Sequence, residues 1–139
     1  MLESKNRNNL DIKISDFGFS CFFDPKEGLD LVLGSPLYMA PEIILNKKYN
    51  QKVDIWSIGV ISYMLMTGSN PFPGKTKQDV KNLIVNSELN YFRPCFTNVS
   101  PEAIDFIKKA LTKDQEKRFS AKQLLDHPWI QIMSKQKIP

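Results

Sequence analysis

The amino-acid sequence predicts a mainly α fold with a small β region near the N-terminus. Only residues 10–14 alternate apolar and polar side chains in the way that a half-buried strand does. Residues 55–66, by contrast, are apolar on nearly every side of a helix. Three later segments begin with residues that cap helices. We therefore expect one strand region followed by about five helices.

A long loop separates the strand from the first helix. Residues 19–33 show no sustained periodicity of apolar side chains and contain Pro25 and Gly28. Long loops of this kind in compact domains are usually functional or disordered.

The sequence predicts helical structure after Pro41. The apolar residues 55–66 then predict a helix that is buried on most of its faces, and Gly68 ends it.

The three later helices have recognisable starts. Each has a side chain that can cap the first turn and a favourable residue shortly after it. The pairs are Thr76 with Asp79, Ser100 with Pro101, and Ser120 with Gln123. The last of these helices is closed by His127-Pro128, and we interpret His127 as a packing residue.

Length and composition favour one soluble globular domain. The chain has 139 residues, of which 42% are hydrophobic and 24% charged, with a formal net charge of +4. No basic run is interleaved with aromatic residues, so a nucleic-acid partner is not expected. The longest apolar stretch, residues 55–66, is shorter than the ~20 residues that cross a bilayer, so no membrane partner is expected either.

The two cysteines, Cys21 and Cys95, form no C-x-x-C pair. Neither a disulfide framework nor a zinc site is therefore indicated. The N-terminus has no apolar signal region and no myristoylation glycine, so we expect a cytoplasmic protein.

Several short motifs occur in a fixed order along the chain. They are Asp16-Phe17-Gly18, Gly34-Ser35-Pro36-Leu37-Tyr38-Met39-Ala40-Pro41-Glu42, Asp54-Ile55-Trp56-Ser57-Ile58-Gly59, Asn70-Pro71-Phe72, Arg118 and His127-Pro128-Trp129. This series resembles the C-terminal lobe of eukaryotic protein kinases of the serine/threonine type, and among these the calcium/calmodulin-dependent and calcium-dependent kinases. The resemblance implies a partial kinase domain over residues 1–132, from a parent α+β fold, and a tail over residues 133–139.

The resemblance implies a nucleotide and metal site at Asp16-Phe17-Gly18. Asp16 would coordinate the Mg²⁺ that bridges the phosphates of ATP, because a hard cation prefers carboxylate oxygen. Gly18 would allow a sharp turn beside it. The alternative is a surface aspartate in an ordinary turn.

A second implied site holds the protein or peptide substrate. The residues concerned are Gly34, Ser35, Tyr38, Ala40, Pro41 and Glu42. Ser35 stands where the family usually has threonine, and its hydroxyl would support the catalytic aspartate and lysine. Glu42 would form a buried ion pair with Arg118. Asp54 would accept hydrogen bonds from the catalytic loop, or it simply caps its helix.

The loop before Gly34 departs from the usual pattern of kinases that are activated by phosphorylation. It has no Ser, Thr or Tyr between Cys21 and Gly34, and Leu31 occupies the usual phosphoacceptor position, although Ser20 remains available. Acidic residues could replace the charge of the phosphate. The candidates are Asp24, Glu27 and Asp30.

The catalytic base and the ATP-covering loop are missing from these 139 residues. The only histidine is His127, so there is no His-Arg-Asp loop, and no two glycines form a G-x-G. We expect a truncated kinase domain that transfers no phosphate by itself and exposes apolar surface, with a regulatory domain lying outside this chain. The alternatives are a non-catalytic kinase-like binding module and a pseudokinase fragment.

Overall fold

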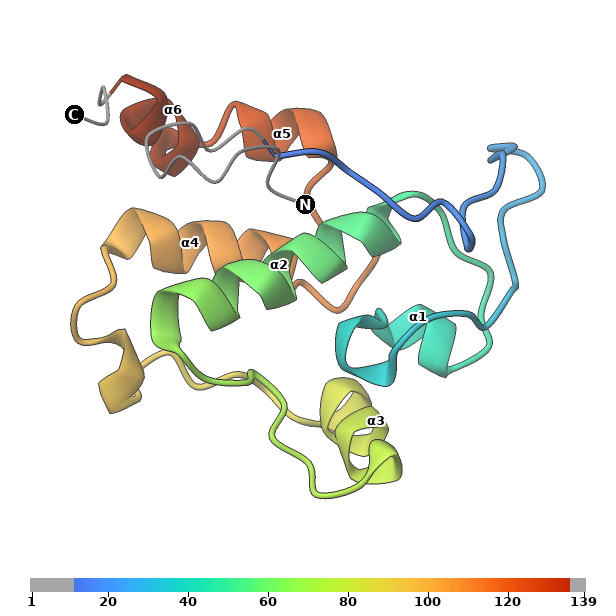
Figure 1. Cartoon of the computed structure of the whole chain (residues 1–139), viewed down its shortest axis with the longest axis horizontal. Helices are drawn as coiled ribbons and strands as arrows, with labels where there is room; N and C mark the ends of the chain where they lie inside the picture. Colours follow the sequence, from blue (N-terminus) through green and yellow to red (C-terminus); the bar gives the residue numbers. More distant parts are fainter. Residues whose placement is uncertain (1–11, 136–139) are drawn as a thin grey trace.

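The computed structural model describes residues 12–135, and their regular structure is almost entirely helical (Figure 1). The elements are the 3-10 helix η1 (Pro36–Tyr38), α1 (Pro41–Ile44), α2 (Lys52–Thr67), α3 (Lys77–Asn86), the 3-10 helix η2 (Pro94–Phe96), α4 (Pro101–Ala110), α5 (Ala121–Leu125) and α6 (Pro128–Lys135). Within residues 12–135 no β-strand is longer than an isolated bridge, such as the antiparallel one between Leu29 and Tyr49. The mainly α fold is thus confirmed. The expected strand at 10–14 lies partly outside the described residues. Its described part is exposed and has no regular structure beyond a bridge at Ile12, so a half-buried strand is wrong for residues 12–14.

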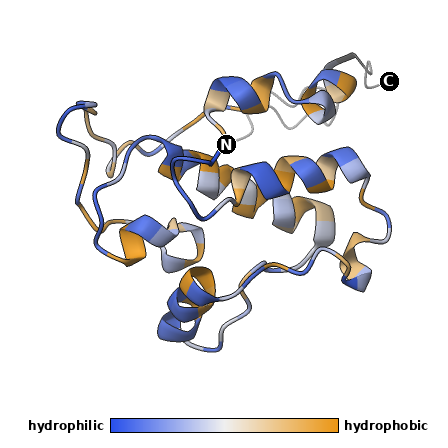
Figure 2. Cartoon of the chain, turned by 180° about the vertical axis from the view of Figure 1, so that it is seen from behind, coloured by the Kyte–Doolittle hydropathy of each residue, from blue (hydrophilic) through white to orange (hydrophobic). Residues whose placement is uncertain are grey.

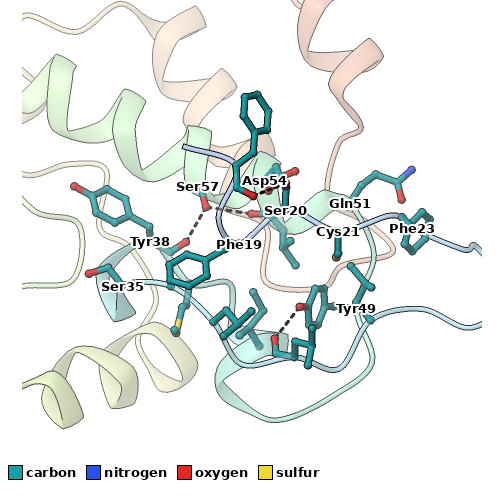
Figure 3. A pocket seen from close by; sticks show the side chains of 18 of the residues that line it. Phe19, Ser20, Cys21, Phe23, Ser35, Tyr38, Tyr49, Gln51, Asp54 and Ser57 are labelled. Atoms are coloured by element: carbon teal, nitrogen blue, oxygen red, sulfur yellow. Dashed lines mark hydrogen bonds between the residues drawn. The ribbon is translucent and has the colours of Figure 1, made fainter. Parts of the chain in front are cut away.

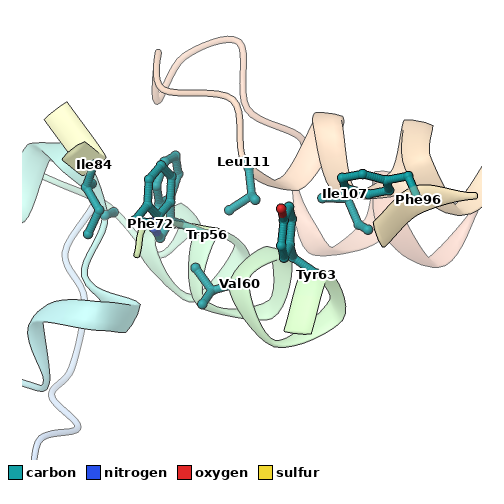
Figure 4. Close-up of a cluster of buried hydrophobic side chains, with 9 residues drawn as sticks. Trp56, Val60, Tyr63, Phe72, Ile84, Phe96, Ile107 and Leu111 are labelled. Carbon is teal, nitrogen blue, oxygen red and sulfur yellow. The ribbon is translucent and has the colours of Figure 1, made fainter. Parts of the chain in front are cut away.

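The core forms around α2, which lies beside α4 (Figure 1). Figure 4 shows side chains from α2, α3, η2 and α4 meeting in one cluster. Its buried members are Ala40, Trp56, Val60, Tyr63, Phe72, Ile84, Phe96, Ile107 and Leu111. The rings of Trp56 and Phe72 stack at 5.8 Å between centroids, and Phe96 meets Tyr63 edge-on at 5.3 Å. Trp56 is therefore a packing residue, as expected.

α3 is amphipathic and completes the core from the other side. Figure 2 shows its hydrophilic residues on the side facing away from the other helices. Ile84 is fully buried, and Val80 and Leu83 pack against the same cluster.

The helix ends follow the expected capping chemistry. Thr76 accepts a hydrogen bond from the backbone N–H of Asp79, whose carboxylate accepts from Thr76 N–H in return. Ser120 and Gln123 form the same reciprocal pair, and Ser100 accepts from the N–H of Ala103. Gly68 ends α2 with a φ of 64°, a left-handed conformation that glycine adopts without strain.

His127 lies between α4, α5 and α6 and is only 5% exposed. Its Nδ1 accepts the N–H of Trp129 at 3.2 Å, so the proton of the neutral ring lies on Nε2, 3.1 Å from a carboxylate oxygen of Asp105. The rings of His127 and Trp129 both contact Phe106. The packing role expected of both residues is confirmed. α6 continues past residue 132, the expected end of the domain, to Lys135.

One face of α2 differs from the sequence prediction. Ile58, Ile61 and Leu65 are 42%, 47% and 74% exposed, and their spacing places them along one side of the helix. The remaining sides of residues 55–66 are mostly buried or half-buried, so the expectation of a helix buried on most faces is confirmed except along this one side. Apolar composition indicates what a helix is able to bury, whereas actual burial depends on a neighbouring element. The expected exposure of apolar surface is confirmed.

The tight contact of α2 with α4 at Gly59 gives a test of this packing. A Cβ atom at Gly59 would lie 2.8 Å from Ala110 Cβ and from two side-chain atoms of Leu111. We expect Gly59→Ala to lower the free energy of unfolding by about 1–3 kcal/mol, since the overpacked helices must separate. Urea denaturation followed by circular dichroism measures this loss. Ser62→Ala, in the same helix, adds no atom and is the control. Equal stability of both variants would contradict the close contact.

Candidate substrate-holding site

The Glu42 carboxylate and the Arg118 guanidinium form a buried, two-pronged ion pair. The distance from Arg118 Nη1 to Glu42 Oε1 is 2.6 Å, and that from Nη2 to Oε2 is 2.9 Å. The Glu42 side chain is 7% exposed and the Arg118 side chain 0%. The remaining N–H groups of Arg118 donate to the carbonyls of Lys52, Thr112 and Lys113. Every donor of the guanidinium therefore has an acceptor, which offsets the cost of burying the charge.

This ion pair fixes the C-terminal end of the segment Gly34–Glu42. Ala40 is fully buried, and Pro41 begins α1, where its missing N–H is no loss. Upstream, the Tyr38 carbonyl accepts a 2.9 Å hydrogen bond from Ser57 Oγ of α2. The backbone of this segment is thus attached to the helical core at two places.

The other end of the same segment is exposed. Gly34 has a φ of 109°, a conformation that other residues rarely adopt. Ser35 precedes η1, and its hydroxyl makes no capping bond. Ser35 and Tyr38 are both exposed. The structure therefore holds the buried end of the segment rigidly and presents its other end to solvent.

Asp16-Phe17-Gly18 begins an exposed turn. Asp16 has a φ of 65°, and its Oδ1 accepts the N–H of Gly18 at 3.2 Å. Ser20 Oγ closes the turn by donating to the Phe17 carbonyl at 2.7 Å. An aspartate tolerates this left-handed conformation better than most residues because its side chain can bond locally.

A cleft of about 650 Å³ lies between this turn, the loop before Gly34 and the start of α2 (Figure 3). Its walls are mostly apolar, and Asp16, Ser35, Tyr49 and Asp54 also line it. The backbone N–H of Asp54 donates to the Gln51 carbonyl at 3.2 Å, whereas its carboxylate makes no hydrogen bond or ion pair within residues 12–135. Partial burial at the cleft raises the pKa of its carboxyl. The catalytic loop expected to bond Asp54 is not among these residues.

The fit of Asp16 to Mg²⁺ can be judged from its surroundings. Its carboxylate is exposed, and Mg²⁺ is commonly held by one or two carboxylates together with water and phosphate oxygens. Within the described part of the chain, no group of three or more His, Cys, Asp or Glu side chains could hold a metal ion. The exposed carboxylate of Asp16 could thus provide one oxygen ligand, but no complete Mg²⁺ site is formed within residues 12–135.

Sequence reasoning missed several residues that hold this site together. Ser57 fastens Tyr38, while Lys52 Nζ donates to the carbonyls of Gln115 and Glu116 at 3.0 Å each. Tyr49 is buried, and its hydroxyl donates to the Leu31 carbonyl at 2.7 Å. These contacts join segments far apart in the chain, so no local spacing or capping pattern could reveal them.

The fold matches that of a protein kinase of known structure. The twitchin kinase region from C. elegans aligns with a TM-score of 0.76 and 33% identity, covering 83% of this chain and 21% of that one. The Protein kinase domain family matches residues 1–130, and the chain belongs to this family. The kinase-like fold expected from the motifs is thereby confirmed.

Curated relatives include calcium-dependent protein kinases of plants. Calcium-dependent protein kinase 32 of Arabidopsis thaliana is 45% identical over 130 residues, which cover 94% of this chain and 24% of the relative. Calcium-dependent protein kinase 3 of Oryza sativa subsp. japonica is 41% identical over 134 residues, which cover 96% of this chain and 24% of that relative. The chain thus spans about a quarter of the length of these relatives.

The described helices include none with both the length and the apolar character required to traverse a bilayer.

The ion pair can be tested by removing one of its charges. We expect Glu42→Gln to lower the free energy of unfolding by about 3–5 kcal/mol, because it leaves Arg118 buried without a counter-charge. Chemical denaturation of the purified chain provides the measurement. Glu116→Gln, at an exposed glutamate close to Arg118 in sequence, is the matched control. A loss below about 1 kcal/mol for Glu42→Gln would show that the pair is dispensable.

Proposed function

We propose that this chain is the substrate-holding part of a serine/threonine protein kinase of the calcium-dependent type. The complete enzyme would transfer the γ-phosphate of ATP to a Ser or Thr hydroxyl of a protein substrate. The buried Glu42–Arg118 pair carries the proposal, because it anchors the segment whose sequence resembles the substrate loop of these kinases. The 45% identity to calcium-dependent protein kinase 32 supports the subgroup.

Each exposed site residue would have a distinct task in the complete enzyme. Asp16 would hold Mg²⁺, with Phe17 and Gly18 shaping the turn around it, and the ion would neutralise charge on the phosphates of ATP. Segment 34–42 would hold the peptide, and the free Ser35 hydroxyl would steady the catalytic groups.

The unpaired Cys21 and Cys95 support a reducing, cytoplasmic location.

By themselves, these 139 residues would transfer no phosphate. Phosphoryl transfer needs a base, a phosphate-binding lysine and a nucleotide pocket acting together with the metal. With His127 as the only histidine, buried among aromatic rings, the chain has no His-Arg-Asp base. One Mg²⁺ ligand cannot provide the necessary positioning.

A non-catalytic binding module is the second candidate. The observation that favours it is the exposed side of α2 formed by Ile58, Ile61 and Leu65, where no charge interrupts residues 55–66. An in-frame His-Arg-Asp-x-x-x-x-Asn and a glycine-rich loop in the transcript upstream of Met1 would support the kinase. An in-frame stop codon just upstream, with a nearby transcript start, would support the module.

Activity assays test the kinase proposal directly. We expect no transfer of radiolabelled γ-phosphate to a mixture of Ser and Thr peptides by the purified chain. The natural polypeptide that contains this chain should transfer it, and Asp16→Asn there should lower kcat at least about 100-fold through loss of a metal ligand. Asp126→Asn, an exposed acid near α6, is the control. Full activity of Asp16→Asn would remove Asp16 from the site.

A further inference from the structure

We propose that Tyr49 is a positioning residue that fastens the loop ahead of the substrate segment, so that this loop needs no phosphate to be held. The loop in question is residues 27–33, and Lys48 assists Tyr49. This inference rests on the proposed kinase function. It differs from the charge-replacement hypothesis because the fastening acts on backbone groups and not through acidic side chains.

Four hydrogen bonds join the loop to residues 48 and 49. Leu29 and Tyr49 exchange both backbone bonds, at 2.9 and 2.8 Å. The Tyr49 hydroxyl donates to the Leu31 carbonyl at 2.7 Å, and Lys48 Nζ donates to the Glu27 carbonyl at 2.8 Å (Figure 3 shows the Tyr49 bond). Leu31 is the residue at the usual phosphoacceptor position. Tyr49 therefore holds the backbone at the place where a phosphate would normally act.

The ring of Tyr49 also contacts the substrate segment itself. It is 9% exposed and lies in a buried cluster with Met39 and Ile43, against which Leu29 and Val53 pack. One side chain thus contacts the loop through its hydroxyl and the segment through its ring. Movement of the loop away from Tyr49 would uncover this cluster.

The turn that carries Tyr49 is itself firmly anchored. The backbone N–H of Asn50 donates to Gln115 Oε1 at 2.9 Å, and Lys52 Nζ donates to the carbonyls of Gln115 and Glu116. Arg118 donates to the Lys52 carbonyl at 3.0 Å. The same 112–118 loop therefore supports both the Glu42 ion pair and the turn of Tyr49.

The acidic residues of the loop do not provide an equivalent anchor. Within residues 12–135, Asp24, Glu27 and Asp30 form no ion pair. The Asp24 carboxylate accepts the N–H of Lys26 within its own turn, and Lys48 bonds the carbonyl of Glu27 and not its carboxylate. Charge replacement by these acids thus lacks a cationic partner in the described part of the chain.

The phenol of Tyr49 is kept in its donor form. Burial raises its pKa above the ordinary value, and the nearby Cys21, Asp30 and Asp54 raise it further by opposing a second negative charge. The hydroxyl therefore remains protonated at neutral pH and can donate its hydrogen bond to the Leu31 carbonyl.

Hydrogen–deuterium exchange of the purified chain tests the fastening without requiring activity. Tyr49→Phe removes only the hydroxyl, and we expect amides in residues 29–33 to exchange about 5-fold faster, the effect of losing one hydrogen bond. Lys48→Met should accelerate exchange around residue 27 to a similar degree. Exchange in α2 and α4 should be unchanged, which separates a local role from general destabilisation. Tyr91→Phe, which removes a hydroxyl elsewhere, is the control.

Unchanged exchange in residues 29–33 of Tyr49→Phe would overturn the fastening whatever the activity of the protein. In the natural polypeptide that contains this chain, Tyr49→Phe should raise KM for a peptide at least about 5-fold. KM for ATP should not change. An unchanged peptide KM, or loss of activity after phosphatase treatment, would overturn the positioning role. If exchange responds but the wild-type polypeptide transfers no phosphate, the proposed function fails and the fastening stands as a structural feature.

Discussion

The guanidinium of Arg118 is surrounded by acceptors from segments that lie far apart in the sequence. Glu42 provides both carboxylate oxygens, and Lys52, Thr112 and Lys113 provide carbonyls. Arg118 also lies over the ring of Trp56, 5.1 Å from its centroid, so it is continuous with the hydrophobic core. A charge buried this deeply is stable only while all these partners stay in place. The start of α2, the 112–118 loop and α1 are therefore fixed relative to one another.

This arrangement divides the molecule into a rigid support and an open side. Segment 34–42 is fixed by Glu42 at one end, and the loop before it is bonded to the turn of Tyr49. Between these attachments, Ser35 and Tyr38 face solvent next to the cleft that Asp16 and Asp54 line. Preorganising backbone before a substrate arrives lowers the entropy lost on binding. Such a support suits the proposed holding of a peptide.

Much of the fold could be predicted from the sequence because the signals are local. The caps at Thr76, Ser100 and Ser120 act within one helical turn, and Gly68 ends α2 through its own backbone conformation. The exposed side of α2 could not be predicted in the same way. Ile58 and Val60 are both apolar β-branched residues, yet one is 42% exposed and the other is fully buried. Only a neighbouring helix decides between them, and α4 covers just one side.

In the candidate site, too, some features could be predicted from the sequence and others depend on the tertiary structure. The sequence by itself determined the family motifs, including Asp16-Phe17-Gly18 and the pairing of Glu42 with Arg118, because residue identity and order carry that information. The tertiary structure alone decided that Tyr49 bonds the carbonyl of Leu31 and that Ser57 bonds the carbonyl of Tyr38. A backbone carbonyl is present at every residue, so its bonding partner leaves no mark in the sequence. Which carbonyl a hydroxyl reaches depends on how the chain folds back on itself.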